Sequence, residues 1–191
     1  MADSYVLNAA LFLLRSLLAF YTYILVCRFI LQLFKADFFN PICQGVVRIT
    51  DPPLNYLRRL IPTSKKYDFA AIFLAFGLQL LYLILLVLLF QQNANILGLI
   101  FVAVANTLNK VLSFLIFSIL AFVVLSWISH GGYNPLLEAI RSISSPLLNK
   151  ARKFLPQIAG LDFSPMLVII LLQLIIMLVI IPLRDFGRFS F

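Results

Sequence analysis

The sequence predicts an all-α membrane protein with four transmembrane helices, arranged as two parallel repeats in which an amphipathic loop joins each pair of helices. Three observations predict this fold. Of the 191 residues, 63% are apolar and 12% are charged; the mean hydropathy is +1.05; and two long segments are similar in one register. Soluble domains average about 45–50% apolar and about 25% charged residues. This composition excludes a water-soluble enzyme, a disordered chain and a disulfide scaffold.

Four apolar stretches are long enough to cross a bilayer as helices, which takes about 20 residues. They run at about 9–34, 69–90, 111–129 and 163–183. The apolar stretch 96–108 is too short to span alone. It either extends the third helix beyond the membrane or lies at the interface.

The basic residues predict the orientation of these spans. Ten of the 15 Lys and Arg residues lie in two loops, 35–68 and 130–162. Loops rich in Lys and Arg remain on the cytoplasmic side of a membrane. We therefore expect both loops in the cytoplasm and both termini on the opposite side. The net charge of +8 follows from these loops, so we expect no nucleic-acid partner.

A shift of 94 positions, without a gap, aligns the two halves of the chain. The aligned pairs include Asn40 with Asn134, Pro41 with Pro135, Pro52 with Pro146, Arg58 with Arg152, Pro62 with Pro156, and Asp68 with Asp162. Such matches indicate a tandem duplication, with repeats at 1–95 and 96–191. Because each repeat has two spans, the repeats are expected to be parallel and related by a pseudo-two-fold axis along the membrane normal.

Each loop, 40–62 and 134–156, is predicted to form two short helices. The first begins at an asparagine N-cap followed by proline at the first helical position. The second begins at Asp51-Pro52 or at Pro146, and a later proline, Pro62 or Pro156, ends it. Apolar and basic residues of this second helix lie on opposite sides, which is typical of a helix in the membrane plane. The residues expected to bind anionic headgroups are Arg58, Arg59, Arg152 and Lys153.

Two motifs resemble the YggT family, which also includes bacterial YlmG and its chloroplast relatives. They are Asp51-Pro52 followed by Leu57-Arg58-Arg59-Leu60-Ile61-Pro62, and Pro146 followed by Arg152-Lys153-Phe154-Leu155-Pro156 and Gly160-Leu161-Asp162-Phe163-Ser164-Pro165. The first copy lacks the Gly and the Ser-Pro. The resemblance implies a bacterial inner-membrane protein. The charge asymmetry of the loops would then place both termini in the periplasm. For relatives it suggests roles in osmotic-stress tolerance, in cell or plastid division and nucleoid distribution, and in haem attachment during cytochrome b assembly.

Polar residues at or within the spans allow two interpretations each. Asp68 and Asp162 immediately precede spans, where a carboxylate can cap the helix or handle protons. Gln79 and Gln173 fall near the middle of two spans. They predict either an interhelical hydrogen bond that joins the repeats or the polar lining of a conduction path.

Arg28 lies within the first apolar run, seven residues before Lys35 and thus roughly 10 Å into the membrane. Its side chain can reach the surface by snorkelling. The alternative is a salt bridge to one of three carboxylates, with Gln32 one turn away as a further partner. These carboxylates are Asp51, Asp37 and Asp162.

The sequence offers little for catalysis. It contains a single histidine, His130, and neither an HExxH motif nor a Gly-rich phosphate loop. We therefore expect no catalytic, cofactor or metal site, and two axial histidines for haem are not available within one chain. The favoured function is a non-enzymatic scaffold or assembly factor whose basic loops bind anionic lipid or a partner, either another membrane protein or a second copy. The alternative is a channel or transport-accessory protein in ion and osmotic homeostasis.

Overall fold

The computed structural model of the chain describes residues 2–59, 68–91, 93, 95–128, 132–155 and 162–189. Its regular elements are all helices. Four helices are long and apolar enough to cross a membrane, which confirms the four predicted spans. They are α1 (Ala2–Leu33), α3 (Phe69–Leu89), α4 (Ile96–Ile128), and a last helix made of α6 (Ser164–Ile175), the π-helical turn η1 (Ile176–Ile180) and α7 (Ile181–Phe189).

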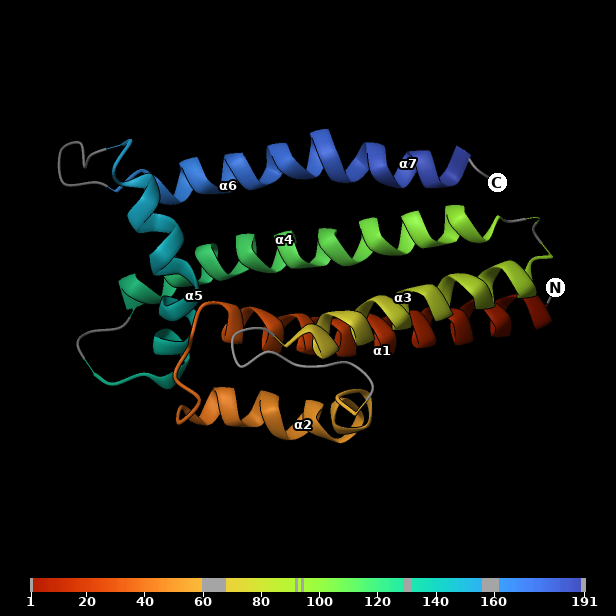
Figure 1. Cartoon of the computed structure of the whole chain (residues 1–191), viewed down its shortest axis with the longest axis horizontal. Coiled ribbons are helices and arrows are strands. Elements are labelled where there is room, and N and C mark those ends of the chain that lie inside the picture. The colour runs from red at the N-terminus through yellow and green to blue at the C-terminus, as the bar shows by residue number, and fades with distance from the viewer. Residues whose placement is uncertain are drawn as a thin grey trace.

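The four spans lie side by side, and both termini lie at the same end of the bundle (Figure 1). Helix α4 is central, since it contacts α1, α3, α6 and α7. The stretch 96–108 extends the third span, because α4 is unbroken from Ile96 to Ile128. Over its 33 residues α4 is about 50 Å long, so it exceeds the roughly 30 Å hydrocarbon core.

In the described part of each loop there is one helix in place of the two that we predicted. Helix α2 (Pro41–Leu57) includes Pro52 and Pro53, and α5 (Pro135–Ala151) includes Pro146. A proline inside a helix removes one backbone hydrogen bond and bends the helix, and Figure 1 shows the last turn of α2 nearly end-on. Beyond the prolines, Leu54 and Leu148 are fully buried. Packing against the spans therefore holds the bent turn in helical conformation, since tertiary contacts supply most helix stability.

The two loop helices differ in direction. Helix α5 crosses the ends of α4 and α6, whereas α2 turns back and runs alongside α1 (Figure 1). The membrane-plane orientation that we predicted for the second short helix of each loop stays a prediction. In α2 this segment is the last, bent turn beyond Pro52, whereas the part of α2 before it runs lengthwise along α1. The cause is a set of ion pairs that holds α2 lengthwise against α1, described below.

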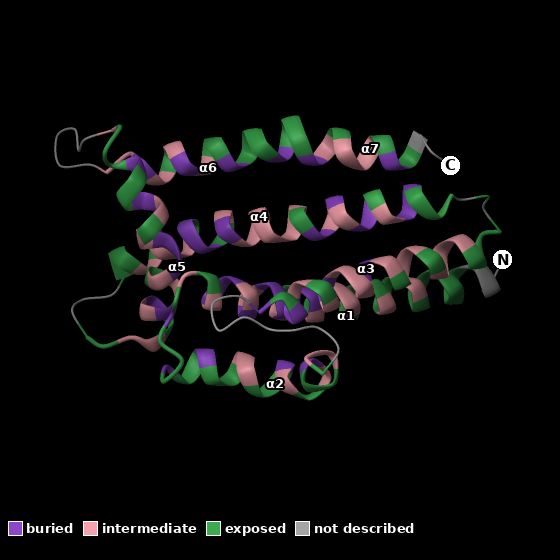
Figure 2. Cartoon of the chain, in the orientation of Figure 1, coloured by how far each residue is buried: buried purple, intermediate pink, exposed green. Residues whose placement is uncertain are grey.

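Buried residues face the inside of the bundle, and the outward faces of the spans expose apolar side chains (Figure 2). Against α1, helix α3 presents Ala70, Ala71 and Ala75, all fully buried. Small residues let membrane helices approach closely. The exposed apolar faces, with Leu17 and Leu81 as examples, are those expected of spans in contact with lipid.

Candidate functional site

Arg28 lies at the buried centre of an ion-pair cluster between α1, α2 and the start of α3. Its Nη2 atom lies 2.8 Å from Oδ1 of Asp51, and its Nε atom lies 3.0 Å from Oδ2 of Asp68. Its Nη1 atom donates to Oγ1 of Thr50 at 2.5 Å and to the carbonyl of Val47 at 3.2 Å. All three guanidinium nitrogens are therefore bonded, and α2 is fastened to α1.

The ion-pair interpretation of Arg28 is confirmed for Asp51. The second carboxylate is Asp68, in place of the predicted Asp37 and Asp162. Asp68 makes no capping hydrogen bond to α3, so its predicted capping role is wrong. A bond to a guanidinium is charge-assisted and stronger than one to a neutral backbone N–H. One signal in the sequence could have identified this pair: α1 ends at Leu33 and α3 begins at the residue after Asp68, so antiparallel packing brings these ends together.

Arg58 closes the cluster by contacting the same two carboxylates. Its Nη1 atom lies 3.2 Å from Oδ1 of Asp51, and its Nη2 atom lies 2.5 Å from Oδ2 of Asp68. Two arginines and two aspartates thus alternate, and their charges cancel. The side chains of Arg28 and Asp68 are only 8% and 1% exposed. Charges at such depth are tolerated when they are paired and hydrogen-bonded.

The second repeat has a simpler version of the same contact. Nη2 and Nε of Arg152 donate to Oδ2 of Asp162 at 2.6 and 2.9 Å. Oδ1 of Asp162 accepts the backbone N–H of Ser164, the first residue of α6, at 2.9 Å. The carboxylate thus meets an N–H at the start of the span, but the N-cap position itself is Phe163. Burial acts to raise the pKa of Asp162, but hydrogen bonds from Ser164 and the ion pair with Arg152 outweigh it and hold the pKa below its ordinary value. This carboxylate is charged at neutral pH.

The two ion pairs occupy equivalent positions in the duplicated sequence. Shifting Arg58 and Asp68 by 94 positions gives Arg152 and Asp162. The same shift places Phe122 where the first repeat has Arg28. At this position the first repeat has a buried arginine and the second has phenylalanine, and we expect this difference to be the reason why α2 lies along its span while α5 does not.

Thr50 and its counterpart Ser144 show the same divergence. In the first repeat, the Thr50 hydroxyl accepts a hydrogen bond from Arg28. In the second, the Ser144 hydroxyl donates to the carbonyl of Ser118 on α4 at 3.2 Å. In the second repeat the loop helix is thus bonded directly to its span, whereas in the first repeat the guanidinium of Arg28 makes this link.

Two segments of the chain match the family model described as CCB3/YggT, at residues 7–89 and 101–183. The second match begins and ends 94 residues after the first, which agrees with the shift that relates the ion pairs. This chain belongs to the CCB3/YggT family.

Relatives of this YggT-family protein are similar over most of their length. An uncharacterized protein of Pseudomonas aeruginosa is 40% identical over 175 residues, covering 91% of this chain and 89% of the relative. The uncharacterized protein YggT of Escherichia coli strain K12 is 35% identical over 183 residues, covering 95% of each. An uncharacterized protein of Haemophilus influenzae is 35% identical over 150 residues, covering 78% of this chain and 79% of the relative. No solved structure matches.

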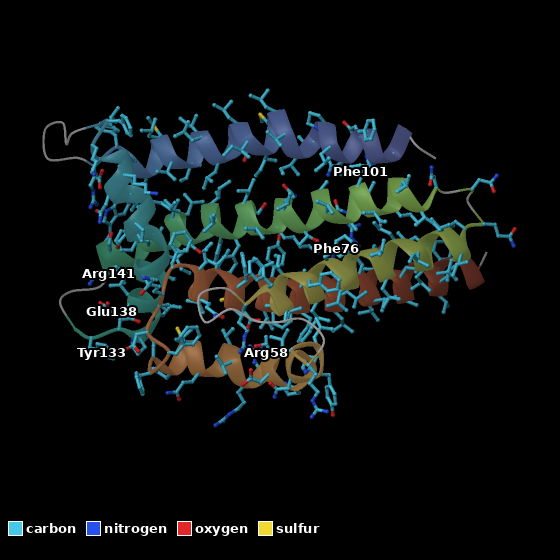
Figure 3. All side chains as sticks on the ribbon, in the orientation of Figure 1. Arg58, Phe76, Phe101, Tyr133, Glu138 and Arg141 are labelled. Carbon is cyan, nitrogen blue, oxygen red and sulfur yellow. The ribbon has the colours of Figure 1, made fainter. Side chains whose placement is uncertain are left out.

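A cavity of about 890 Å³ opens beside the ion-pair cluster of this family member. Its polar lining consists of Arg28, Gln32, Lys35, Gln44, Arg48, Asp51 and Arg58. Arg28 and Arg58 are neutralised by Asp51 and Asp68. The positive charge that remains comes from Lys35 and Arg48, so the cavity favours an anionic group. Its volume is within the range of about 300–1,000 Å³ typical of ligand sites. Figure 3 shows Arg58 in the space between α2 and α1.

The two loops meet at their N-caps. Oδ1 of Asn40 accepts the N–H of Ile42 at 2.8 Å, and Nδ2 of Asn40 donates to the carbonyl of Pro135 at 2.7 Å. Oδ1 of Asn134 accepts the N–H of Leu136 at 3.0 Å. Both predicted caps are confirmed, each followed by proline at the start of its helix.

A cavity of about 170 Å³ lies between the loops, lined by Asp37, Asn40, Tyr133, Glu138, Ala139 and Ser142. Tyr133, Glu138 and Arg141 mark this region in Figure 3.

The four basic residues expected to bind headgroups divide into two kinds. Arg58 and Arg152 are ion-paired, whereas Arg59 and Lys153 are exposed at the ends of the loop helices. Headgroup binding stays a prediction for all four.

The remaining predicted positions are prolines and the histidine. Pro165 lies in the first turn of α6. Three further predicted positions, Pro62, Pro156 and His130, lie outside the described residues.

Gln79 and Gln173 occupy different environments despite their equivalent positions in the sequence. Gln79 is buried and lines a cavity inside the bundle. Gln173 is exposed on α6. Helices α3 and α6, both fully described, do not contact each other. The predicted hydrogen bond between these two amides is therefore wrong.

Two observations on the described side chains concern metal binding and nucleophilic chemistry. Among the described residues, no group of three His, Cys, Asp or Glu side chains could hold a metal ion. Burial, reinforced by the charge of Asp37, raises the pKa of the Cys43 thiol. A thiol that stays protonated at neutral pH is a poor nucleophile. The features suited to ligands in these loops are therefore the cationic cavity and the exposed basic ends of α2 and α5.

Proposed function

We propose that this protein is a non-enzymatic scaffold of the bacterial inner membrane, whose cytoplasmic loops bind anionic lipid headgroups and present the spans to a membrane-protein partner. One observation carries the proposal. The ion pairs Arg58–Asp68 and Arg152–Asp162, which we call the anchors, carry no net charge. Near them, at the ends of the loop helices, exposed cations lie close in sequence to exposed aromatic rings: Arg59 to Tyr56, and Lys150 and Lys153 to Phe154.

This pairing of cations and rings suits the boundary between headgroups and acyl chains. The Arg59 guanidinium lies 5.9 Å from the ring centroid of Tyr56, and Phe154 is 82% exposed. Aromatic rings bury in the interfacial region while Arg and Lys reach anionic headgroups. Each such cation contributes about 1 kcal/mol of attraction to an anionic surface.

The anchors favour a role in positioning. Because Arg58 and Arg152 hold the ends of α2 and α5 against the spans, lipid bound at these ends would orient the whole bundle. The excess of basic residues in the loops supports a cytoplasmic location for them and a periplasmic one for the termini. The partner would be another membrane protein or a second copy, and the clients that we favour belong to membrane-protein or cytochrome assembly, cell division or osmotic-stress tolerance.

Fluorescence quenching by lipid tests the proposal. A fluorophore is attached to Phe154→Cys, with Cys27 and Cys43 changed to Ala, in full-length protein reconstituted with brominated lipid. Phosphatidylglycerol in a phosphatidylcholine membrane should increase quenching about two-fold, and added salt should remove the increase. The double variant Arg59→Gln/Lys153→Gln should lose the increase, and Arg141→Gln/Arg188→Gln, which removes the same charge elsewhere, should keep it.

Equal quenching in the two double variants would contradict headgroup binding. The orientation has its own test, because cysteines placed at Gly45 and Gly132 should react with a membrane-impermeant reagent only from the cytoplasmic side. Labelling of either cysteine from the periplasm would contradict the proposed topology.

A second candidate function, a channel or transport accessory, is favoured by the position of Gln79. Its buried amide lines a polar cavity inside the spans. If that cavity belongs to a conduction path, proteoliposomes should show ion flux that Gln79→Leu abolishes. The matched control is Gln173→Leu, at the equivalent but exposed position, which should leave the flux unchanged. Absence of flux from the unmodified protein would count against transport.

A further inference from the structure

A cavity of about 490 Å³ lies inside the bundle, between α1, α3, α4 and α7. Three cations line it, Arg15, Lys110 and Arg184, together with the amides of Gln79, Asn106 and Asn109. No acidic residue lines it among those that the structure describes. Arg15 lies 13 residues from Arg28 on α1, so the cavity is about 20 Å from the ion-pair cluster.

Lys110 is half-buried in the interior of the long helix α4. It is 14 residues from Ile96 and 18 from Ile128, the two ends of α4, and therefore about 21 and 27 Å from those ends. Charged side chains within spans are rare, because burial in hydrocarbon is costly, and they commonly mark functional sites. The Lys110 ammonium lies 5.9 Å from the ring centroid of Tyr23, a contact that does not neutralise it.

Arg184 is directed into the bundle by tight packing one turn further along α7. A Cβ atom on Gly187 would lie 2.8 Å from the carbonyl oxygen of Gly98 on α4. The rings of Phe101 and Phe186 meet edge to face at 5.3 Å. The Nε atom of Arg184 is buried and has no hydrogen-bond partner among the described residues. A buried donor without a partner is rare in folded proteins and calls for a ligand or water.

We propose that this cavity binds an oxyanion of the phosphate type, either a free anion or the headgroup phosphate of a phospholipid. Three positive charges without a carboxylate repel one another where the dielectric constant is low. A bound phosphate supplies the missing negative charge, and Arg and Lys are its usual ligands. The amide N–H groups of Gln79, Asn106 and Asn109 complete the donor set. This site is separate from the loop surface to which the proposed function assigns headgroups.

The proposal makes two linked predictions about the double variant Lys110→Gln/Arg184→Gln. Without an anion, the variant should be at least as stable as the unmodified protein, because repulsion between like charges is relieved. Adding the anion should not raise the stability of the variant. The matched control is Arg188→Gln, which neutralises an exposed arginine one turn beyond Arg184 on the same helix.

Thermal unfolding of the full-length protein in maltoside micelles, which carry no phosphate, tests this in two arms. One arm adds inorganic phosphate, at about ten times its Kd, to the micelles. The other adds phosphatidylglycerol to the micelles in phosphate-free buffer. Binding should raise the Tm of the unmodified protein and of Arg188→Gln by about 5 °C and leave the double variant unshifted.

The two arms also identify the source of the anion. A shift with inorganic phosphate assigns a free oxyanion, and a shift with phosphatidylglycerol alone assigns a headgroup. No shift in either arm, or an equal shift in the double variant, would overturn the proposal. The exposed loop cations Arg59 and Lys153 are present in every sample, so failure here leaves the proposed function intact.

Discussion

Arg28 and Asp68 form a buried ion pair, 3.0 Å from Nε to Oδ2, that joins the first span to the beginning of the second. The pair is 40 residues apart in the sequence and makes the first repeat different from its copy. Because burial strips both charges of water, each depends on the other.

Changing Asp68 to Asn should therefore destabilise the protein by about 1.5–3 kcal/mol, the range for a hydrogen bond to a charged group, because Arg28 loses one of its two carboxylates and keeps Asp51. Asp162→Asn is the matched control in the second repeat, where the side chains of Arg152 and Asp162 are 42% and 25% exposed. That change should cost only about 0.2–1 kcal/mol. Reversible unfolding in mixed micelles gives both values, and equal costs would contradict the importance of burial.

Changing Arg28 to Phe gives the first repeat the residue of the second. We expect α2 to separate from α1, because the bonds from Arg28 to Asp51, Thr50 and Val47 are lost. Spin labels on Gly45→Cys and Leu17→Cys, with both native cysteines changed to Ala, report this separation as a longer and broader distance distribution. An unchanged distribution would show that apolar packing alone orients α2. Phe122→Leu, at the equivalent position, is the control.

Asn40 combines a cap with a link between the loops, and two substitutions separate these roles. Asn40→Asp keeps an oxygen for the Ile42 N–H but cannot donate to Pro135, so it should lose about 1 kcal/mol. Asn40→Ala loses both contacts and should lose about 2 kcal/mol. Asn134→Ala, which removes a cap only, should resemble Asn40→Asp. Hydrogen exchange should show faster exchange at the start of α5 in both Asn40 variants, and unchanged exchange there would contradict the link.

The Asp162 contribution should disappear in acid. The pKa of Asp162 is held below its ordinary value by Ser164 and Arg152 against the opposing effect of burial. Its stabilisation is therefore complete above the unfolded pKa, about 3.9, and is lost as the pH falls through the lower folded pKa. The difference in unfolding free energy between the unmodified protein and Asp162→Asn should be constant above about pH 5 and shrink toward pH 3. A difference that grows in acid would contradict the assignment.

Gly187 should not tolerate a side chain. In Gly187→Ala the new methyl group would overlap the Gly98 carbonyl oxygen at 2.8 Å, so α7 must shift and the protein should lose about 1–3 kcal/mol. Gly77→Ala is the control, because a Cβ there meets nothing within 4 Å. It should be neutral or stabilising by up to about 1 kcal/mol through helix propensity. Equal stability of the two variants in micelle unfolding would contradict the close contact of α4 and α7.

Features that depend on residues close together in the sequence, or on a regular spacing along it, were predictable from the sequence. The four spans follow from runs of apolar residues, because backbone groups in hydrocarbon must bond within a helix. The caps at Asn40 and Asn134 follow from the asparagine-proline pairs, and the duplication follows from matches at one spacing. Each of these signals is local or periodic, so no knowledge of tertiary contacts was needed.

Contacts between distant residues were decided by the tertiary structure. The prolines at 52 and 146 lie inside helices because Leu54 and Leu148 beyond them are buried. Asp68 bonds to Arg28 instead of capping α3 because antiparallel packing of α1 and α3 brings the two side chains together. Equivalent glutamines differ because one faces the bundle and the other faces outward.

The sequence by itself determined the number of spans, their duplication and the excess of basic residues in the loops, since these are properties of composition and spacing along the chain. Only the tertiary structure decided which charges meet. Four cations, Arg28, Arg15, Lys110 and Arg184, lie in or beside apolar runs and look alike in the sequence. The fold gives Arg28 two carboxylates and places the other three around a cavity with no carboxylate among its described lining residues. The difference matters because the energy of a charge depends on its neighbours in space.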